Sequence, residues 1–519
     1  MTSDAPQRPG YGPATPTRTG PPVADAPQAE CAERDEDDTV LVQTHTACLL
    51  MTGALVLKWK KPVDLGFVDF RTRADRVLAC QHELELNRRL AADVYLGVGE
   101  AHGPDGIVQE PYLLMRRLPA RLRLATLVRQ GRPVLGHVDA IARLLADFHS
   151  RCAVPGDAAE LVAPARLRRL WQEALGVLRG HAPAVASTAD LHRAGELVDA
   201  YLAGRSTLLR QRVEHGQVRD GHGDLLADDV FCLPDGPRVL DCLDFDPQLR
   251  CGDVVGDVAF LAMDLEHLGD VTAAHRLWEQ YRVHSDEHHP QTLVHFYTAY
   301  RAAVRAKVCC LRGEQLPPGD ARDVQLHEAA ELMGLSLRHL ERTRLTLTLI
   351  GGLPGSGKSS LAEAVTAAGD DVLLSSDLIR HELHGPDSGP DEEPYAGRAY
   401  AGTVTDEVYR TMLRRARIEL TRGVSVVLDA SWATEAHRHA ARALCTETST
   451  VLVEVLCEVT DDVAEARLSS RGPDHDSDAT AAVRTAMRAR TASWPTATSI
   501  DTRGPLGVAV GIAAALREG

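Results

Sequence analysis

Residues 345–365 read LTLTLIGGLPGSGKSSLAEAV, an apolar run followed by a glycine-rich loop and then by a stretch of helical character. The loop, from Gly352 to Ser359, has the spacing Gly-x-x-x-x-Gly-Lys-Ser of a phosphate-binding P-loop. Glycines allow consecutive backbone N–H groups to curl around phosphate oxygens, and a helix N-terminus adds the positive end of its dipole. The stretch therefore predicts a nucleotide-binding site between a strand and a helix.

Individual residues of this loop have expected roles. Lys358 is expected to reach the β- and γ-phosphates, and the Ser359 hydroxyl is expected to ligate Mg²⁺. ATP and Mg²⁺ are thus the predicted cofactors. The alternative, a tight turn that binds no nucleotide, is disfavoured by the flanking strand and helix. Further loop residues expected to contact the nucleotide are Gly352, Gly355, Ser356, Gly357 and Ser360.

Apolar segments recur through the rest of the C-terminal part, at residues 372–374, 424–428 and 451–456. Strands that alternate with helices favour a parallel sheet, so we predict an α/β P-loop domain over residues 341–519. Asp429 directly follows the second of these segments. A carboxylate there would order Mg²⁺, although acidic residues at strand ends are also common for structural reasons.

The segment Leu373-Leu-Ser-Ser-Asp377-Leu-Ile-Arg380 follows the P-loop helix. A strand leading to Ser-x-Asp-x-x-Arg resembles small P-loop kinases of the gluconate kinase, polynucleotide kinase and zeta-toxin type. The resemblance implies that Asp377 lies beside an acceptor hydroxyl and that Arg380 grips the substrate. The plainer reading of Asp377 is a helix N-cap.

Arginines further along are candidates for contacts with the transferred phosphate. Arg467 and Arg471 are four residues apart and would share one helix face. In the kinases named above such arginines lie on a lid and neutralise developing charge. A solvated helix face is the alternative. Arg438 is a further candidate for substrate binding.

The middle of the chain contains a second group of carboxylates, Gly221-His222-Gly-Asp224-Leu-Leu-Ala-Asp-Asp229 and then Asp241. Phosphoryl transfer needs one carboxylate to orient the attacking hydroxyl and others to hold Mg²⁺. The pattern resembles the aminoglycoside phosphotransferase-like kinases, distant relatives of protein kinases. It implies that Asp224 is the catalytic aspartate, that Asp241 is the main Mg²⁺ ligand, and that His222 braces the loop. Asp229 stands where the family has asparagine and would also hold Mg²⁺, with added negative charge.

Features upstream support this resemblance. Lys58 and Lys60 share one face of a predicted strand, and Lys60 is favoured as the contact to ATP, with Lys58 close behind. Glu83, on a predicted helix, is the candidate ion-pair partner. The stretches 60–70 and 83–90 resemble a bacterial family in which an α+β module of this protein-kinase-like type is fused to a P-loop kinase. The predicted domain spans residues 37–340.

Bulk properties restrict the class of protein. The chain has 519 residues and a formal net charge of −16, which argues against nucleic acid or a membrane surface as partner. Its 11 cysteines are scattered without a Cys-x-x-Cys pair, as expected for reduced thiols in the cytoplasm. Residues 1–36 are rich in proline, glycine and acidic side chains and predict a disordered tail. No signal peptide or long apolar run is evident.

Three functional hypotheses follow from these patterns. The first is an ATP- and Mg²⁺-dependent phosphotransferase whose two kinase-type modules act on an alcohol group of a small molecule. The second is a P-loop kinase or ATPase regulated by a ligand-binding, catalytically weak kinase-like module. The third is a nucleic-acid end kinase, which the net charge disfavours.

Overall fold

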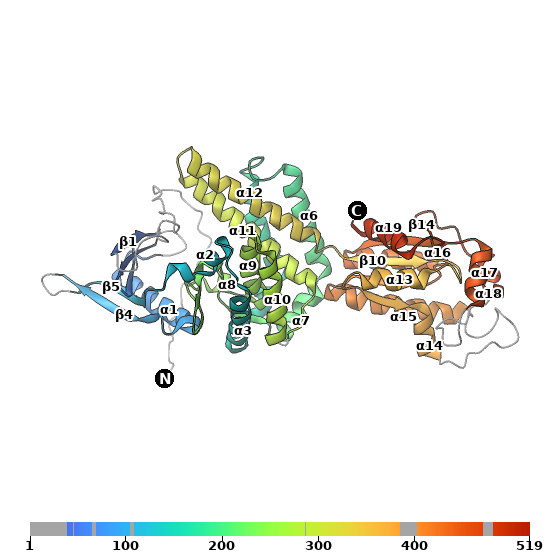
Figure 1. Ribbon diagram of the computed structural model, residues 1–519, viewed down its shortest axis with the longest axis horizontal. Coiled ribbons are helices and arrows are strands. Elements are labelled where there is room, and N and C mark those ends of the chain that lie inside the picture. The colour runs from blue at the N-terminus through green and yellow to red at the C-terminus, as the bar shows by residue number, and fades with distance from the viewer. Residues whose placement is uncertain are drawn as a thin grey trace, which may run out of the picture.

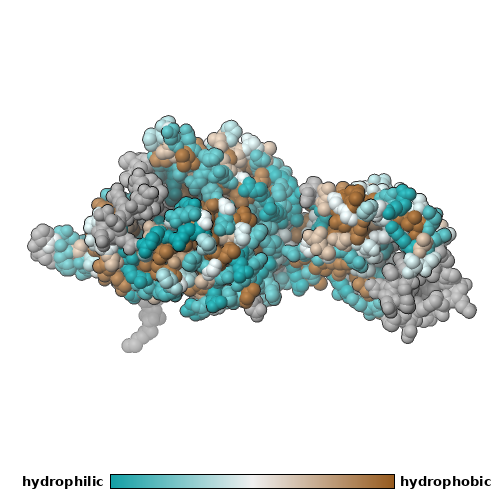
Figure 2. All heavy atoms as spheres, in the orientation of Figure 1, coloured by the Kyte–Doolittle hydropathy of each residue, from teal (hydrophilic) through white to brown (hydrophobic). Residues whose placement is uncertain are grey.

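The structure is a computed structural model that describes residues 39–44, 46–64, 69–103, 108–285, 287–384, 402–470 and 481–518. The predicted N-terminal tail, residues 1–36, lies outside these ranges. Along the chain the described elements form an N-terminal sheet, a helical region and a C-terminal region built around a second sheet (Figure 1). The visible face is largely hydrophilic with scattered apolar residues (Figure 2), because most apolar side chains are inside.

The N-terminal region is a 5-stranded antiparallel sheet in the order β1-β2-β3-β5-β4. Helix α1 (Arg73–Ala91) packs against β4 and β5, and the Thr72 hydroxyl caps it by accepting a hydrogen bond from the Asp75 N–H. Along β3, Val56 belongs to the apolar cluster under the sheet, and the two-residue period places Lys58 and Lys60 on the same face. The strands are β1 (Val40–Gln43), β2 (Ala47–Thr52), β3 (Leu55–Lys60), β4 (Tyr95–His102) and β5 (Val108–Arg116).

The middle region is mainly helical and has its own large apolar core. Short antiparallel pairs, β6 with β9 and β7 with β8, present the loops that contain the predicted carboxylates. The helices are α2 (Leu124–Arg129), α3 (Leu135–Arg151), α4 (Ala158–Leu161), α5 (Pro164–Arg179), α6 (Thr188–Gly204), α7 (Ser206–Glu214), α8 (Pro247–Arg250), α9 (Val254–His267), α10 (Val271–Ser285), α11 (Gln291–Gln315) and α12 (Asp320–Glu341). The remaining elements are two 3₁₀ turns (Ala120–Leu122 and Ala227–Asp229), β6 (Val218–Asp220), β7 (Val230–Leu233), β8 (Gly236–Val239) and β9 (Cys251–Asp253).

The C-terminal region is a 5-stranded parallel sheet in the order β11-β12-β10-β13-β14. Leu347 and Leu349 of the central strand pack towards α14, α15 and α16, whereas Ile350 packs towards α13 and α19. Both faces are therefore covered by helices, as is usual for parallel sheets. The elements are β10 (Thr346–Gly351), α13 (Lys358–Ala367), β11 (Val372–Ser375), α14 (Ser376–His384), α15 (Gly402–Arg422), β12 (Val426–Asp429), α16 (Glu435–Thr448), β13 (Val451–Glu458), α17 (Asp461–Ser469), α18 (Ala481–Arg488), β14 (Thr498–Asp501) and α19 (Leu506–Glu518).

The helical region and the C-terminal region contact each other directly. The buried guanidinium of Arg205 donates to the backbone carbonyl of Leu420 at the end of α15, at 2.6 Å. The Thr292 hydroxyl donates to the Gly423 carbonyl at 2.8 Å. A Cβ on Gly204 would lie 2.1 Å from the Thr448 carbonyl oxygen, so backbone meets backbone at this contact.

The predicted strand with Lys58 and Lys60 and the four predicted strands of the C-terminal part are present, with ends shifted by a few residues. Sequence patterns missed β2, β4 and β14, which are short or only half-buried and so have weak apolar periodicity. The predicted boundary between residues 340 and 341 falls at the last residue of α12. No described helix is long and apolar enough to cross a membrane.

Candidate functional site

The loop between β10 and α13 brings its backbone close to neighbouring segments. Gly357, immediately before α13, has φ +84°, and a Cβ there would lie 3.1 Å from the guanidinium of Arg467. Gly352 has φ +145°, and a Cβ there would lie 2.7 Å from the Cys457 carbonyl oxygen. Side chains of L-amino acids rarely adopt these angles, so both positions require glycine. The loop ends at a helix N-terminus, whose first N–H groups have no partner within the helix and suit a phosphate.

Lys358 and Ser359, the first residues of α13, converge on Asp429 at the end of β12. The Ser359 hydroxyl donates to Asp429 Oδ2 at 2.7 Å, and Lys358 Nζ lies 3.2 Å from Asp429 Oδ1. The two parallel strands β10 and β12 are neighbours, so their carboxyl ends meet here. A hydroxyl, an ammonium and a carboxylate at one point are the groups that would hold Mg²⁺ and nucleotide phosphates.

Two other predicted loop residues differ in exposure. Ser356 is buried, and its Oγ has no hydrogen-bond partner within the described ranges. Ser360 is exposed on the outer side of α13. The unsatisfied Ser356 hydroxyl is a donor that a phosphate oxygen would satisfy, whereas Ser360 faces solvent.

The predicted acceptor-binding residues lie at the start of α14, directly after β11. Arg380 Nη1 donates to Asp377 Oδ1 at 2.8 Å, and the Asp377 N–H donates to Ser375 Oγ at 3.3 Å. The buried Tyr409 of α15 lies near Arg380 and Lys358, whose charges act on its hydroxyl, but burial dominates and raises the pKa of Tyr409. The charges of Arg380 and of the P-loop lysine Lys358 are thus both felt at this buried tyrosine.

Tyr409 itself was not predicted from the sequence. Its hydroxyl accepts a hydrogen bond from the Trp432 N–H at 3.0 Å and lies 3.2 Å from Ser431 Oγ, two residues beyond Asp429. Its ring stacks on His437, with ring centroids 3.8 Å apart. No local sequence signal marks this tyrosine, because its place depends on how α15 packs against the sheet.

The three arginines predicted to contact phosphate or substrate differ in what the structure shows of them. Arg467 donates to the Thr502 carbonyl at 2.7 Å and lies 3.5 Å from the Gly355 carbonyl, so it braces the P-loop backbone from outside. Arg471 lies outside the described residues. Arg438 is fully buried and donates to the Ser493 carbonyl at 2.9 Å, which gives it a structural contact.

In the N-terminal part, Glu83 of α1 contacts both lysines of β3. Lys58 Nζ and Lys60 Nζ each lie 2.8 Å from a carboxylate oxygen of Glu83. Burial would raise the pKa of Glu83, but these lysines outweigh it and lower the value to about 2. Lys58 also lies 3.2 Å from Asp241, whereas Lys60, the lysine favoured from the sequence, lies 2.8 Å from Asp244 and is only 5% exposed. Lys58 is therefore the lysine beside the predicted metal ligand.

Asp257 of α9 fixes the backbone of the loop that contains Asp224. Its carboxylate accepts hydrogen bonds from the N–H groups of His222, at 2.6 Å, and Gly223, at 2.9 Å. A Cβ on Gly221 would lie 2.1 Å from the same carboxylate. Burial opposes ionisation, but contacts with His149 and nearby positive charge dominate and lower the pKa of Asp257. The sequence pattern gave Asp257 no role.

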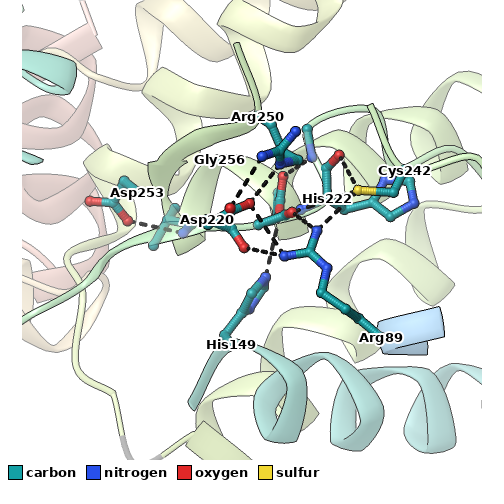
Figure 3. Close-up of polar contacts among 12 residues, drawn as sticks. Arg89, His149, Asp220, His222, Cys242, Arg250, Asp253 and Gly256 are labelled. Carbon is teal, nitrogen blue, oxygen red and sulfur yellow. Dashed lines mark hydrogen bonds and ion pairs between the residues drawn. The ribbon is translucent and has the colours of Figure 1, made fainter. Parts of the chain in front are cut away.

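Arg89 and Arg250 also contact this loop, and both form ion pairs with Asp220 (Figure 3). Arg89 donates to the carbonyls of Asp220, at 2.9 Å, and Gly221, at 2.7 Å. Arg250 lies 2.6 Å from Asp220 Oδ1 and also donates to the Leu243 carbonyl. The His222 ring, predicted to brace the loop, has Nε2 3.0 Å from the Leu240 carbonyl oxygen, next to Asp241.

The predicted carboxylates Asp224, Asp229 and Asp241 lie close enough to influence one another. Burial, together with the charge of Asp241, raises the pKa of Asp224 despite nearby arginines. Burial, Asp241 and Asp224 raise the pKa of Asp229 well above its usual range. Such mutual repulsion is relieved by a proton or a cation. Across the described ranges no group of three or more His, Cys, Asp or Glu side chains is arranged to hold a metal ion.

A cavity of about 600 Å³ opens beside Asp224. Its wall is formed by the loop around Gly221, the segment after β8, one face of α5 and one face of α11. Arg301 of α11 connects this wall to the loop, because it donates to the carbonyls of Gly223, at 3.2 Å, and Gly256, at 3.0 Å. The cavity has the size of small-molecule sites.

Together these observations define the class of the protein. An α+β part with a 5-stranded antiparallel sheet precedes an α/β P-loop part with a 5-stranded parallel sheet, as the sequence predicted. The AAA domain family matches residues 347–493, which include the P-loop and Asp429. The matched segment thus contains the residues that would hold a nucleotide and Mg²⁺.

The chain has close relatives over nearly its whole length. It is 40% identical over 479 residues to the uncharacterized protein Rv2004c of Mycobacterium tuberculosis H37Rv, covering 92% of this chain and 95% of that protein. The uncharacterized protein Mb2027c of Mycobacterium bovis matches at the same identity and coverage. The chain belongs to the family of these mycobacterial proteins.

Solved structures resemble each part separately. A gluconokinase from Sinorhizobium meliloti 1021 covers 34% of this chain and 95% of its own, with 17% identity and a TM-score of 0.26. A choline/ethanolamine kinase family protein from Mesorhizobium loti covers 58% of this chain and 92% of its own, with 15% identity and a TM-score of 0.36.

Proposed function

We propose that the protein is an ATP- and Mg²⁺-dependent phosphotransferase that acts on a hydroxyl group of a small molecule. The observation that carries this proposal is the convergence of Lys358 and Ser359 on Asp429 at the P-loop. Lys358 would contact the β- and γ-phosphates, and Ser359 with Asp429 would hold Mg²⁺. Mg²⁺ held by Ser359 and Asp429 would supply positive charge against the charge that develops during transfer.

At the P-loop the acceptor side is proposed to be Asp377 and Arg380. Asp377 would orient the acceptor hydroxyl, and Arg380, which is paired with it, would both position that carboxylate and contact the substrate. Their position directly after β11, a neighbour of β12, supports this assignment, because it places them at the same edge of the sheet as Asp429.

A second transfer site is proposed around Asp224 in the kinase-like part. Lys58, held between Glu83 and Asp241, would contact the α- and β-phosphates, and Lys60 would serve to position Glu83. Asp241 and Asp229 would hold Mg²⁺, and Asp224 would orient the acceptor hydroxyl in the adjoining cavity.

The test is an ATP-consumption screen with the full chain against sugars, amino sugars, aminoglycosides, nucleosides and 5′-hydroxyl oligonucleotides. Lys358→Ala and Asp224→Ala variants separate the contributions of the two sites. Lys61→Ala is the matched control, because that lysine donates to the Thr44 carbonyl and belongs to neither site. We expect each site variant to lose its own activity; activity unchanged in both variants would overturn the proposal.

A regulatory role for the kinase-like part is the second candidate. Asp229 motivates it, because an acidic side chain where the resembling kinases have asparagine adds repulsion beside the nucleotide phosphates. In this version the kinase-like part binds a ligand and controls the P-loop kinase through the contact at Arg205 and Leu420. Turnover that depends on Asp224 would exclude it.

The domain limits, the binding partner and the cellular location are proposed from the same observations. We assign residues 37–340 to the kinase-like domain and 341–519 to the P-loop domain, with a small-molecule acceptor as partner and no role for nucleic acid or membrane. The cysteines of the described part are free thiols, which supports a reducing cytoplasm as the place of action.

A further inference from the structure

Five charged side chains link β3 and α1 to the segment that follows β8. They form one chain of ion pairs in which the sign of the charge alternates at every step. The order is Asp241, Lys58, Glu83, Lys60 and Asp244, and the successive distances are 3.2, 2.8, 2.8 and 2.8 Å. Because Asp241 and Asp244 lie close together in the sequence, the sheet and α1 hold this segment at two points.

The two points of attachment differ in exposure. Asp241 is 58% exposed, so the pair that it forms with Lys58 is open to a ligand. Asp244 is 19% exposed and Lys60 only 5%, and the Lys60 ammonium also lies 5.4 Å from the centre of the Phe70 ring. Burial would lower the pKa of Lys60, but its carboxylate partners outweigh burial and raise it, so this lysine stays charged. The second attachment is therefore an enclosed ion pair.

A nucleotide bound as proposed would engage both members of the exposed pair. Lys58 would turn to the phosphates and Asp241 to Mg²⁺, so each would give up part of its contact with the other. Lys60 and Asp244 have neither role. Their ion pair is thus a link between β3 and the segment after β8 that nucleotide binding leaves in place.

The backbone at Asp241 depends on such support. Asp241 has φ +63°, in the left-handed region that residues other than glycine seldom adopt. Surrounding contacts are needed to impose a conformation of this kind. The Tyr95 hydroxyl accepts the Asp241 N–H at 3.3 Å, and Asn87 Oδ1 accepts the Cys242 N–H at 2.9 Å. These neutral contacts hold the backbone at Asp241, and the ion pair of Asp244 holds the segment just beyond it.

The carboxylate of Glu83 is shared between two lysines. Lys58 lies against one of its oxygens and Lys60 against the other. A buried ammonium whose only counter-charge was this carboxylate would compete with its neighbour for it. Asp244 gives Lys60 a second carboxylate, which leaves Glu83 able to orient Lys58 towards a nucleotide.

We infer that Asp244 is a positioning residue of the kinase-like site. Through Lys60 it anchors the segment after β8, so that Asp241 keeps its place for Mg²⁺ when Lys58 is drawn to the nucleotide. This inference rests on the proposed function, because it presupposes a nucleotide site at Asp241. Asp244 itself contacts neither the nucleotide nor the metal ion.

The test measures ATP binding calorimetrically in the full chain at a series of Mg²⁺ concentrations. All variants are made in a Lys358→Ala background, which removes the P-loop signal. Asp244→Asn should raise the Mg²⁺ concentration at half-maximal binding by on the order of ten-fold, since a hydrogen bond to a charged group is worth about that factor. Saturating Mg²⁺ should return the ATP affinity to near that of the background chain. Asp244→Glu, which keeps the charge, should shift the Mg²⁺ midpoint less.

Asp246→Asn is the matched control, because it removes the same charge from the same segment. Asp246 caps α8 by accepting the Gln248 N–H at 2.8 Å. Its loss should leave the Mg²⁺ midpoint unchanged even where it lowers the unfolding temperature. An unchanged midpoint in Asp244→Asn, or an equal shift in Asp246→Asn, would overturn the inference alone. Absent Mg·ATP binding in the Lys358→Ala chain would overturn the proposed nucleotide site and the inference with it.

Discussion

The Asp257 carboxylate accepts the backbone N–H of His222 at 2.6 Å, across 35 residues of sequence, and thereby ties the Asp224 loop to helix α9. The same carboxylate accepts the Gly223 N–H, so two buried donors depend on one side chain. Each buried donor left without a partner costs about 1–3 kcal/mol. The loop that places Asp224 is therefore rigid only while Asp257 is intact and ionised.

Asp257→Ala should lower the free energy of unfolding by at least about 1–3 kcal/mol and reduce turnover that depends on Asp224. Urea unfolding and phosphoryl-transfer assays measure the two effects. Asp199→Ala is the control, because Asp199 forms an exposed ion pair with Arg168 that is worth about 0–1 kcal/mol. Equal stability of the two variants would contradict the role given to Asp257.

Asp229→Asn should stabilise the protein at neutral pH in the absence of Mg²⁺. Burial, Asp241 and Asp224 raise the pKa of Asp229 in the folded state. A raised value means that its stabilising contribution is full below the unfolded pKa of about 4 and is lost as pH rises through the folded pKa. The asparagine side chain of the variant does not ionise, so the variant does not lose this contribution to stability as pH rises.

Thermal unfolding of wild type and Asp229→Asn between pH 4 and pH 8 checks the sign. The advantage of the variant should grow with pH, and Mg·ATP should reduce it by supplying a cation to the wild-type carboxylate. An advantage that is constant across the pH range would show that Asp229 is not ionising against its neighbours.

Lys58→Met and Lys60→Met should separate binding from stability. Lys58 stands between Glu83 and Asp241, so its loss should weaken Mg·ATP binding at the kinase-like site. Lys60 is nearly buried between Glu83 and Asp244, so its loss should destabilise the fold by about 3–5 kcal/mol. Both variants are made in a Lys358→Ala background, which removes the P-loop signal, and are compared by calorimetry and urea unfolding. The reverse pattern would restore Lys60 as the nucleotide contact.

Asp377→Asn should lower transfer at the P-loop site by on the order of 10²–10⁴-fold while Mg·ATP binding stays near wild type. The reason is that an orienting carboxylate acts on the acceptor rather than on the nucleotide. Steady-state assays in an Asp224→Ala background and nucleotide titrations measure the two quantities. If nucleotide binding and transfer rate fell together, Asp377 would hold the metal ion or fix Arg380 rather than orient the acceptor.

The sequence predicted those parts of the fold and site that are encoded locally. The P-loop needs only adjacent residues, and the end of an apolar strand marks Asp429. Neighbouring residues do not show which of Lys58 and Lys60 would contact the nucleotide, because strand alternation places both on one face. The two lysines differ only in their contacts with distant carboxylates, Asp241 for Lys58 and Asp244 for Lys60. Asp257 and Tyr409 act through contacts between distant segments, and no nearby spacing reveals such contacts.

The contact between the helical region and the P-loop region gives the last prediction. A Cβ on Gly204 would lie 2.1 Å from the Thr448 carbonyl oxygen, so Gly204→Ala must push the two regions apart. Gly195→Ala, in the same helix α6, is the matched control, because its Cβ would meet only the end of Arg179 at 3.9 Å. That control should be neutral or stabilise the helix by up to about 1 kcal/mol.

Each region has its own apolar core, so Gly204→Ala should leave both folded while it weakens their contact. We expect thermal unfolding to separate into two transitions and limited proteolysis to cut near residues 342–345, with neither change in Gly195→Ala. The hydrogen bond from Arg205 to the Leu420 carbonyl lies at the same interface. The variant therefore also tests whether ligands of the kinase-like part change ATP turnover at the P-loop site of Lys358. Backbone atoms this close cannot accept a methyl group without moving. A single transition at the wild-type temperature would therefore mean that the backbone shifts locally at the contact and the two regions stay together.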